Sequence, residues 1–234
     1  MARATRWLYE LGAAPYGWCT AQAGWDGSCA ALVRGLGTPP RRLLDLGCGP
    51  GGVLAAAAAA WPRAELWGVD VAARMLAEAG RRQPWRPARP AAAPRLVRAD
   101  ARRLPFPDGV FDAVTAHSFL YLVPDRAAVL VEAWRVLAPG GRLALMEPWA
   151  GPAPPRAVLR CCREPRFLLS VALWRCFSRW RGRFGAAALA ALLREHGFVA
   201  PRGRIALGGL GLLAYANKPP SAPPGVAAPA GGLV

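Results

Sequence analysis

The sequence predicts an α/β fold in which a parallel sheet carries helices on both faces. Three observations support this prediction: short apolar runs alternate with helical segments, a glycine-rich turn at residues 47–52 follows the first apolar run, and 234 residues suit one domain. Strands that alternate with helices pair in parallel, because each crossover helix returns the chain to the same end of the sheet.

The predicted strands are short apolar runs bounded by glycine, proline or charged residues. In chain order they cover residues 43–47, 65–71, 95–98, 111–116, 142–146, 198–206 and 210–217. Glycines at positions 208, 209 and 211 separate the last two.

The predicted helices cover residues 53–61, 72–79 and 186–196, and Pro124-Asp125 opens another. In that helix Leu130, Trp134 and Leu137 form the apolar face, and Pro139-Gly140-Gly141 end it. Gly197 suits a left-handed cap at the end of the last helix.

The domain prediction is one unit over residues 1–218. Residues 81–94 are rich in Arg, Pro and Ala and read as a loop, and residues 150–184 read as an insertion. Residues 219–234 contain Pro, Ala and Gly without charge and predict a disordered tail.

The net charge of +16 comes almost entirely from arginine, since Lys218 is the only lysine among 30 basic residues. A GC-rich coding sequence produces such a composition without a function for the charge. The alternative is an anionic partner, such as a membrane surface or nucleic acid.

The composition also bears on the cellular compartment in which we expect the protein. No apolar stretch reaches the roughly 18 residues that a membrane span needs. The apolar core of a secretory signal peptide does not follow Arg3 and Arg6. The six cysteines form no C-x-x-C pair and there are only two histidines, so we expect reduced thiols, no metal site and a cytoplasmic protein.

The glycine-rich turn is the strongest functional signal. Gly47, Gly49 and Gly52 satisfy G-x-G-x-x-G, and Asp70, 18 residues after Gly52, suits a carboxylate that accepts ribose hydroxyls. A nicotinamide-dependent oxidoreductase is therefore one alternative. Asp45 argues against it, because its charge would repel a pyrophosphate and suits a cationic amino acid instead.

Four segments in order, DLGCGPGG, GVDVAARML, RADARRLPFPDGVFDAV and RVLAPGGRLALMEP, resemble the class I S-adenosylmethionine-dependent methyltransferases. The similarity is greatest to the small-molecule and lipid branch related to the ubiquinone/menaquinone-biosynthesis methyltransferases. The resemblance implies a Rossmann-like three-layer α/β/α fold and a mostly parallel seven-stranded sheet whose last strand is antiparallel. It also implies S-adenosyl-L-methionine as the cofactor, and a cap over the acceptor site in the insertion at residues 150–184.

The resemblance carries a set of cofactor-binding residues onto this chain. Asp45 and the backbone of the glycine turn would hold the methionine half, Asp70 the ribose, and Asp100 with Ala101 the adenine edge. The full set is Tyr16, Asp45, Gly47, Cys48, Gly49, Gly51, Asp70, Val71, Met75, Asp100, Ala101 and His117.

The candidate catalytic residues are His117 and Tyr121. His117 follows the fourth strand and has an ordinary pKa of about 6.5, so it suits a general base; a hydrogen bond to the cofactor or simple packing is the alternative. Tyr121 would orient the acceptor. Tyr16 also fits plain helix packing, and Asp112 and His196 are interpreted as structural.

The acceptor is expected to be a small molecule or a lipid, methylated on nitrogen or oxygen. Arg175, Arg179 and Arg183 predict a basic face between Phe167 and Arg183, with Trp174, Phe177 and Trp180 on another face. This pattern fits a peripheral membrane contact or a cap helix packed on the sheet.

The sequence lacks the motifs of several other partners and substrates. No base-reading or stacking motif indicates nucleic acid, and the expected motifs for arsenic and base substrates are missing. A homologue that binds the cofactor without catalysis stays an alternative.

Overall fold

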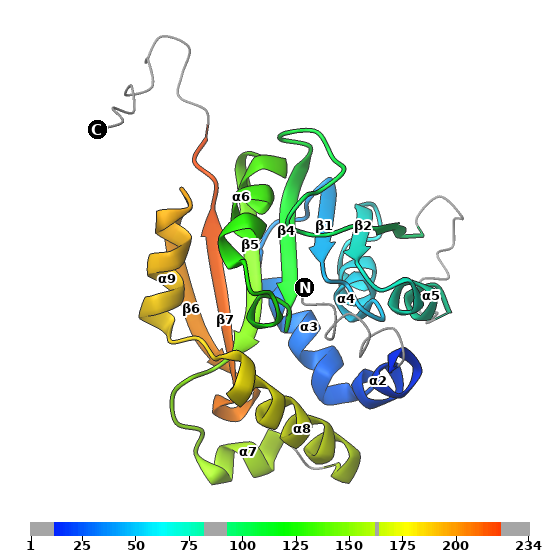
Figure 1. Ribbon diagram of the computed structural model, residues 1–234, viewed down its shortest axis with the longest axis vertical. Helices are drawn as coiled ribbons and strands as arrows, with labels where there is room; N and C mark the ends of the chain where they lie inside the picture. Colours follow the sequence, from blue (N-terminus) through cyan, green and yellow to red (C-terminus); the bar gives the residue numbers. More distant parts are fainter. Residues whose placement is uncertain (1–11, 82–92, 162–163, 221–234) are drawn as a thin grey trace.

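The computed structural model describes residues 12–81, 93–161 and 164–220 and shows a seven-stranded sheet of order β3-β2-β1-β4-β5-β7-β6 (Figure 1). β7 runs antiparallel to both β5 and β6, whereas β1 to β5 pair in parallel. The predicted fold class is therefore confirmed, including the antiparallel last strand. The strands are β1 (Arg42–Leu46), β2 (Glu65–Asp70), β3 (Arg95–Arg98), β4 (Phe111–His117), β5 (Leu137–Pro148), β6 (Val199–Ala206) and β7 (Gly211–Asn217).

Helices pack on both faces of the sheet, with α6 and α9 on the near face and α3 and α4 behind it in the view of Figure 1. They are α2 (Ala13–Thr20), α3 (Ala23–Gly35), α4 (Gly52–Ala60), α5 (Ala73–Arg81), α6 (Arg126–Val136), α7 (Pro155–Cys161), α8 (Pro165–Arg181) and α9 (Ala186–Glu195). Two short 3-10 turns, η2 (Leu120–Leu122) and η3 (Leu207–Gly209), complete the described chain.

The order of the sheet positions the site. β1 pairs with β2 on one side and with β4 on the other. The order in which successive strands are added to the sheet therefore changes direction at β1. In a parallel sheet such a reversal leaves a crevice at the carboxyl ends of the strands. α2 and α8 lie at this end, and the two helices contact each other (Figure 1).

The two helices before β1 were not predicted. α2 and α3 contain Gly17, Gly24 and Gly27, which weaken any helical periodicity. Packing explains two of these glycines: a Cβ at Gly17 would press on the Glu78 side chain, and a Cβ at Gly24 would overlap the ring of Phe167. Tertiary contacts therefore require residues that the helix propensity disfavours.

The predicted end of the helix after Asp125 was wrong. Asp125 caps α6 as expected, accepting from the Ala128 N–H at 3.0 Å, but the helix ends at Val136. Leu137 is the first residue of β5, so Pro139-Gly140-Gly141 lie within a strand. The Lys218 N–H donates to the Gly141 carbonyl at 2.8 Å, which extends the pairing beyond β7. Trp134 is 37% exposed rather than core.

Parts of two predicted segments fall outside the described residues: 82–92 of the predicted loop and 221–234 of the predicted tail. Arg81 itself ends α5. Among the helices that the structure describes, none combines the length and the apolar character needed to cross a bilayer.

Candidate functional site

The glycine turn between β1 and α4 is shaped by its backbone. Gly47 has φ +61° and Gly49 φ +50°, a region that L side chains avoid. A Cβ at Gly47 would also overlap the ring of Phe119, whereas a Cβ at Gly49 would meet only the Gly47 carbonyl at 3.9 Å. Glycine is thus required at position 47 both by the backbone conformation and by the nearby Phe119 ring. At position 49 it is required by the backbone conformation alone, and it leaves room for a ligand.

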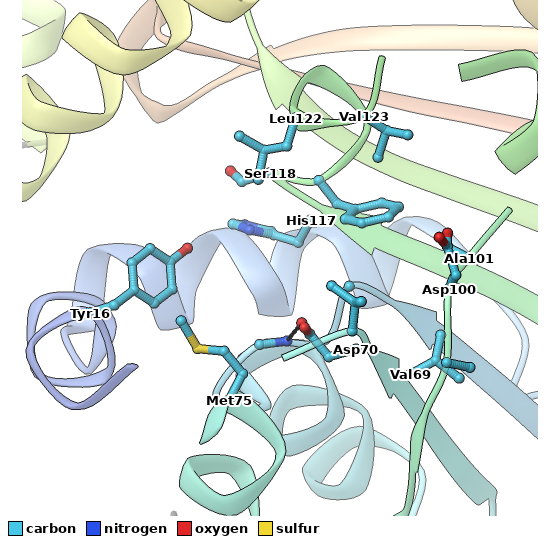
Figure 2. Close-up of a pocket in the computed structure, with 15 residues that line it drawn as sticks. Tyr16, Val69, Asp70, Met75, Asp100, Ala101, His117, Ser118, Leu122 and Val123 are labelled. Atoms are coloured by element: carbon cyan, nitrogen blue, oxygen red, sulfur yellow. Dashed lines mark hydrogen bonds between the residues drawn. The ribbon is translucent and has the colours of Figure 1, made fainter. Parts of the chain in front are cut away.

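Asp70 ends β2 and is fixed by two backbone donors. The Gly49 N–H donates to its Oδ2 at 3.0 Å (Figure 2). The Ala72 N–H donates to its Oδ1 at 2.8 Å. A carboxylate oxygen can accept more than one hydrogen bond. The Asp70 side chain therefore links the glycine turn to the next helix.

Asp45 is a buried carboxyl in β1. The Thr115 hydroxyl donates to its Oδ1 at 2.7 Å, but burial outweighs this bond and raises the pKa of Asp45 to about 8, with a further contribution from the charge of Asp70. A cation close to Asp45 would restore its negative charge. This environment suits a cationic group such as an amino group.

Two spaces meet at the carboxyl ends of the strands. A small pocket runs from Asp70 past Val71 to Asp100 and Ala101, and a cavity of about 470 Å³ extends toward α8. Five residues line both: Tyr16, Gly47, Gly49, His117 and Ser118. A ligand in the pocket would thus adjoin one in the cavity beside His117.

Most of the predicted cofactor residues line these spaces. The small pocket is lined by Tyr16, Gly47, Gly49, Asp70, Val71, Met75, Asp100, Ala101 and His117 (Figure 2), and the cavity by Asp45 and Cys48. Gly51 lines neither; with φ +81° it is the residue before α4. The side chains of Asp100 and Arg102 are hydrogen-bonded, which lowers the pKa of Asp100 to about 2.

Tyr16 and Met75 close one side of the pocket. Met75 is buried with Ala13 and Ala72, and Tyr16 packs against this group. Burial raises the pKa of Tyr16 to about 12, so its phenol stays protonated. The packing and the binding interpretations of Tyr16 are therefore compatible.

His117 ends β4, is half-buried and lines both spaces. Its Nε2 lies 2.7 Å from the Ser28 Oγ on α3, and Trp25 contacts the ring edge-on at 6.1 Å between centroids. Burial lowers the pKa of His117 to about 4, so the imidazole is neutral at physiological pH. The near-neutral pKa assumed from the sequence was therefore too high, because the sequence does not reveal the burial.

Glu147 holds the turn after His117. This buried carboxyl at the end of β5 accepts from the N–H groups of Phe119, Leu120 and Tyr121 at 3.2, 2.8 and 3.1 Å. Burial nevertheless raises its pKa to about 7. Tyr121 lines the cavity, so Glu147 positions a candidate catalytic residue that the sequence had identified.

Sequence analysis missed Ser28, Trp25, Ser118 and Glu147. Ser28 and Trp25 lie in helices that were not predicted, and Glu147 is an ordinary residue within a strand pattern. Ser118 has φ +54° and a buried hydroxyl that has no hydrogen-bond partner among the residues that the structure describes. Its only sequence signal is its place directly after the fourth strand.

α8 forms one wall of the cavity. Ser170, Leu173, Trp174 and Phe177 line it, and the Trp25 Nε1–H donates to the Ser170 Oγ at 2.9 Å. Trp25 also contacts the rings of Phe167 and Trp174 edge-on, at 5.6 and 5.3 Å between centroids. Trp25 thus contributes one hydrogen bond and two ring contacts to the docking of α8 on α3.

The predicted basic face was wrong. α8 ends at Arg181, and Arg183 turns back to donate to the Arg175 carbonyl at 2.7 Å. Arg175 itself donates to the Trp149 carbonyl at 2.7 Å, so these arginines stabilise the fold, whereas Arg179 is exposed. Trp174 and Phe177 face the cavity, and Trp180 is 84% exposed instead of sharing their face.

The comparisons with known proteins agree with this geometry. A family model described as a methyltransferase domain matches residues 44–145. The demethylmenaquinone methyltransferase of Thermus thermophilus is 43% identical over 117 residues, half of each chain. The trans-aconitate 2-methyltransferase of Streptomyces coelicolor is 34% identical over 177 residues, 75% of this chain and 52% of the relative. The chain thus spans about half the length of these curated relatives.

A solved structure shows the same fold. The phosphoethanolamine N-methyltransferase 2 of Haemonchus contortus, in complex with S-adenosyl-L-methionine, superposes with a TM-score of 0.66 at 15% identity. The match covers 92% of this chain and 60% of that one.

Proposed function

Because residues 44–145 carry a class I, S-adenosylmethionine-dependent methyltransferase domain, we propose that the whole protein methylates a small-molecule or lipid-like acceptor. The observation that carries the proposal is the open cavity beside His117 and Tyr121. A homologue that binds the cofactor without catalysis would not need that space. The comparisons also favour methyl transfer over the nicotinamide-dependent alternative.

The residues present fit the cofactor. Asp45 would hold the amino group of the methionine half and Asp70 the ribose hydroxyls, while Asp100 and Ala101 line the far end of the pocket where the adenine would lie. Gly49 leaves room for the ligand, as its absent Cβ faces open space. When bound, S-adenosylmethionine supplies a methyl group already activated as a sulfonium.

The chain's own contribution is then mainly to position the acceptor. His117 offers a neutral ring that can receive a proton from the acceptor, and Ser28 orients that ring. Tyr121, held by Glu147, lies at the cavity wall to orient the acceptor. His117→Gln should lower the rate about a hundredfold or more if the proton transfer is needed.

The test is transfer of a labelled methyl group. Full-length protein is incubated with methyl-labelled S-adenosylmethionine and a cell extract, which is then separated into organic, aqueous and macromolecular fractions. Label in small molecules, absent with Asp70→Ala, supports the proposal. Label on macromolecules alone, or cofactor binding without any transfer, contradicts it.

We extend the proposal to the domain organisation and the surroundings of the enzyme. Residues 1–218 would form one domain with residues 150–184 as its cap, since α8 lines the cavity and β6 and β7 complete the sheet. The free thiols of Cys19, Cys29, Cys48 and Cys176 are consistent with the cytoplasm.

A peripheral membrane contact through residues 167–183 is part of this proposal. Trp180 and Leu169, 84% and 56% exposed, lie on α8 with the exposed Arg179. The protein should co-sediment with anionic phosphatidylserine vesicles more than with phosphatidylcholine vesicles, and Trp180→Ala should reduce this binding. If the unsubstituted protein and Trp180→Ala co-sediment equally with both kinds of vesicle, α8 acts only as a cap and the membrane contact is contradicted.

A further inference from the structure

The two histidines of the chain are held by different ring nitrogens. His196 places its Nδ1 2.8 Å from the Leu192 carbonyl. A carbonyl can only accept, so Nδ1 of His196 carries a hydrogen. His117 instead places its Nε2 2.7 Å from the Ser28 Oγ. A hydroxyl can donate or accept, so the other contacts of Ser28 determine where the His117 ring carries its hydrogen.

The Ser28 hydroxyl has a second partner. Its Oγ donates to the Trp25 carbonyl, three residues earlier on α3, at 2.8 Å. A serine hydroxyl has a single hydrogen, and this bond uses it. The contact of 2.7 Å between Oγ and Nε2 therefore needs a hydrogen from the ring. His117 then carries its hydrogen on Nε2 and a lone pair on Nδ1.

Two other helical serines show the same arrangement with partners that can only donate. The Ser170 Oγ donates to the carbonyl three residues earlier at 2.9 Å and accepts from the Trp25 Nε1–H at 2.9 Å. The Ser178 Oγ donates to the carbonyl three residues earlier at 3.1 Å and accepts from the Arg183 Nε–H at 3.2 Å. Neither an indole nor a guanidinium has an acceptor atom. Ser28 makes the same bond to its helix, which leaves it free to accept from a ring N–H.

The alternative tautomer carries the hydrogen on Nδ1. Burial lowers the pKa of His117, and a hydrogen bond between the ring and its own backbone partly offsets this effect. Such a bond would suit a hydrogen on Nδ1. Nε2 would then take the Ser28 hydrogen, and the Ser28 Oγ would face the Trp25 carbonyl at 2.8 Å with no hydrogen between the two oxygens. Two acceptors at this distance repel each other, and the Nε2–H form avoids this repulsion.

We propose that Ser28 holds His117 in the Nε2–H form, so that Nδ1 is the ring nitrogen that takes the proton of the methyl acceptor. His117 lines both the small pocket and the cavity, and its Nε2 is directed to α3. Nδ1 is therefore the nitrogen left to meet an acceptor. This inference rests on the proposed methyltransferase function and identifies the reacting atom of its base, with Ser28 as a positioning residue.

The step involves one proton. The acceptor oxygen or nitrogen forms a bond to the methyl carbon, and the electron pair of the broken carbon–sulfur bond stays on sulfur. The proton that the acceptor loses goes to Nδ1, which makes the ring an imidazolium. Both nitrogens of an imidazolium donate, so Nε2–H keeps its bond to the Ser28 Oγ before and after the transfer. In the other tautomer the free lone pair would lie on Nε2, where Ser28 blocks it.

The tautomer can be measured directly by NMR. Full-length protein labelled with ¹⁵N-histidine is saturated with S-adenosylhomocysteine, and long-range ¹H–¹⁵N correlation spectra of the rings are recorded at pH 7.5. Only two rings contribute, and His196→Gln identifies the signals of His117. His117 should carry its hydrogen on Nε2, whereas His196 is the internal reference for a hydrogen on Nδ1. A hydrogen on Nδ1 of His117, or a mixture of both forms, would overturn the inference.

A matched pair of variants tests the role of Ser28. Ser28→Ala removes the acceptor of Nε2–H, and His117 should then exchange between both tautomers. Ser178→Ala makes the same substitution at a serine that has the same two kinds of bond but does not line the cavity, and His117 should keep the Nε2–H form. Ser28→Thr keeps a hydroxyl that can bond the same carbonyl and should restore this form. An unchanged tautomer in Ser28→Ala, or the same change in Ser178→Ala, would show that Ser28 does not fix the ring.

Kinetics connect the tautomer to the reaction. With an acceptor identified by the labelling experiment, Ser28→Ala should lower kcat about tenfold and leave KM within about twofold, because Ser28 positions a base rather than a ligand. An unchanged kcat would contradict this role. The spectrum of the S-adenosylhomocysteine complex needs no turnover, so the two proposals fail separately. Absence of methyl transfer would overturn the methyltransferase proposal, whereas methyl transfer by a protein whose His117 carries the hydrogen on Nδ1 would overturn this inference alone.

Discussion

Asp70 and Asp45 show how one residue type performs two tasks in one site. Asp70 is held by two backbone N–H groups at the end of β2, while Asp45 is buried beside Thr115 with a raised pKa. We propose that the first accepts from hydroxyls and that the second meets a cation. Their roles are set by surroundings that the spacing in the sequence only partly indicates.

At the residue scale, Asp70→Ala should weaken binding of S-adenosylhomocysteine by about a hundredfold or more. The substitution removes a charged acceptor and also frees the Gly49 and Ala72 N–H groups that it holds. Calorimetry measures the loss. Asp108→Ala, an exposed carboxylate paired with Arg135, is the control and should bind normally. Normal binding by Asp70→Ala would remove Asp70 from the cofactor site.

At the element scale, the turn η2 depends on the carboxyl of Glu147. Its pKa of about 7 in the fold exceeds the ordinary 4.5, so the folded protein keeps a proton that the unfolded chain releases. The free energy of unfolding should therefore fall as the pH rises from about 4.5 to 7, by up to about 3 kcal/mol. Glu147→Gln should remove this part of the pH dependence in urea unfolding between pH 5 and 8.

The pH dependence of the free energy of unfolding must be compared between the unsubstituted protein and Glu147→Gln. The raised pKa of Asp45 contributes a slope of the same sign, and the lowered pKa of His117 contributes one of the opposite sign below pH 6.5. Both contributions are retained in Glu147→Gln. Identical pH profiles for the two proteins would show that Glu147 does not titrate in this range.

The cap helix α8 is the second element whose role can be tested. Trp25→Ala removes the hydrogen bond to Ser170 and the ring contacts with Phe167 and Trp174. We expect a loss of about 3–5 kcal/mol in stability and faster amide hydrogen exchange concentrated in α8. Trp180→Ala, an exposed tryptophan on the same helix, should change stability by less than about 0.5 kcal/mol. Equal effects of the two substitutions would contradict docking through Trp25.

At the scale of the whole molecule, the described residues end at Pro220. The last backbone hydrogen bonds beyond β7 are those that Lys218 and Pro219 make with Gly141 and Gly140. A chain that ends at Pro220 should therefore keep its free energy of unfolding within about 0.5 kcal/mol and its affinity for S-adenosylhomocysteine. A large loss in either would show that residues 221–234 belong to the domain.

The sequence by itself determined the sheet and which side chains gather at the carboxyl ends of β1 and β2. Alternating apolar runs and the glycine turn are local signals, and parallel pairing brings the ends of β1, β2 and β4 together whatever the details of packing. Asp45, Asp70 and the glycines at 47 and 49 could be placed for this reason. Gly51, assigned with them, shapes the start of α4 and lines neither space.

Only the tertiary structure decided the acceptor half. Its walls come from α3, α8 and η2, which lie far apart in the sequence, and the helical pattern of α3 is obscured by glycines. The contact between Ser28 and His117, the lowered pKa of His117 and the inward turn of Arg175 all depend on burial. Burial is a property of the assembled chain, because desolvation depends on every element packed around a group rather than on its neighbours in sequence.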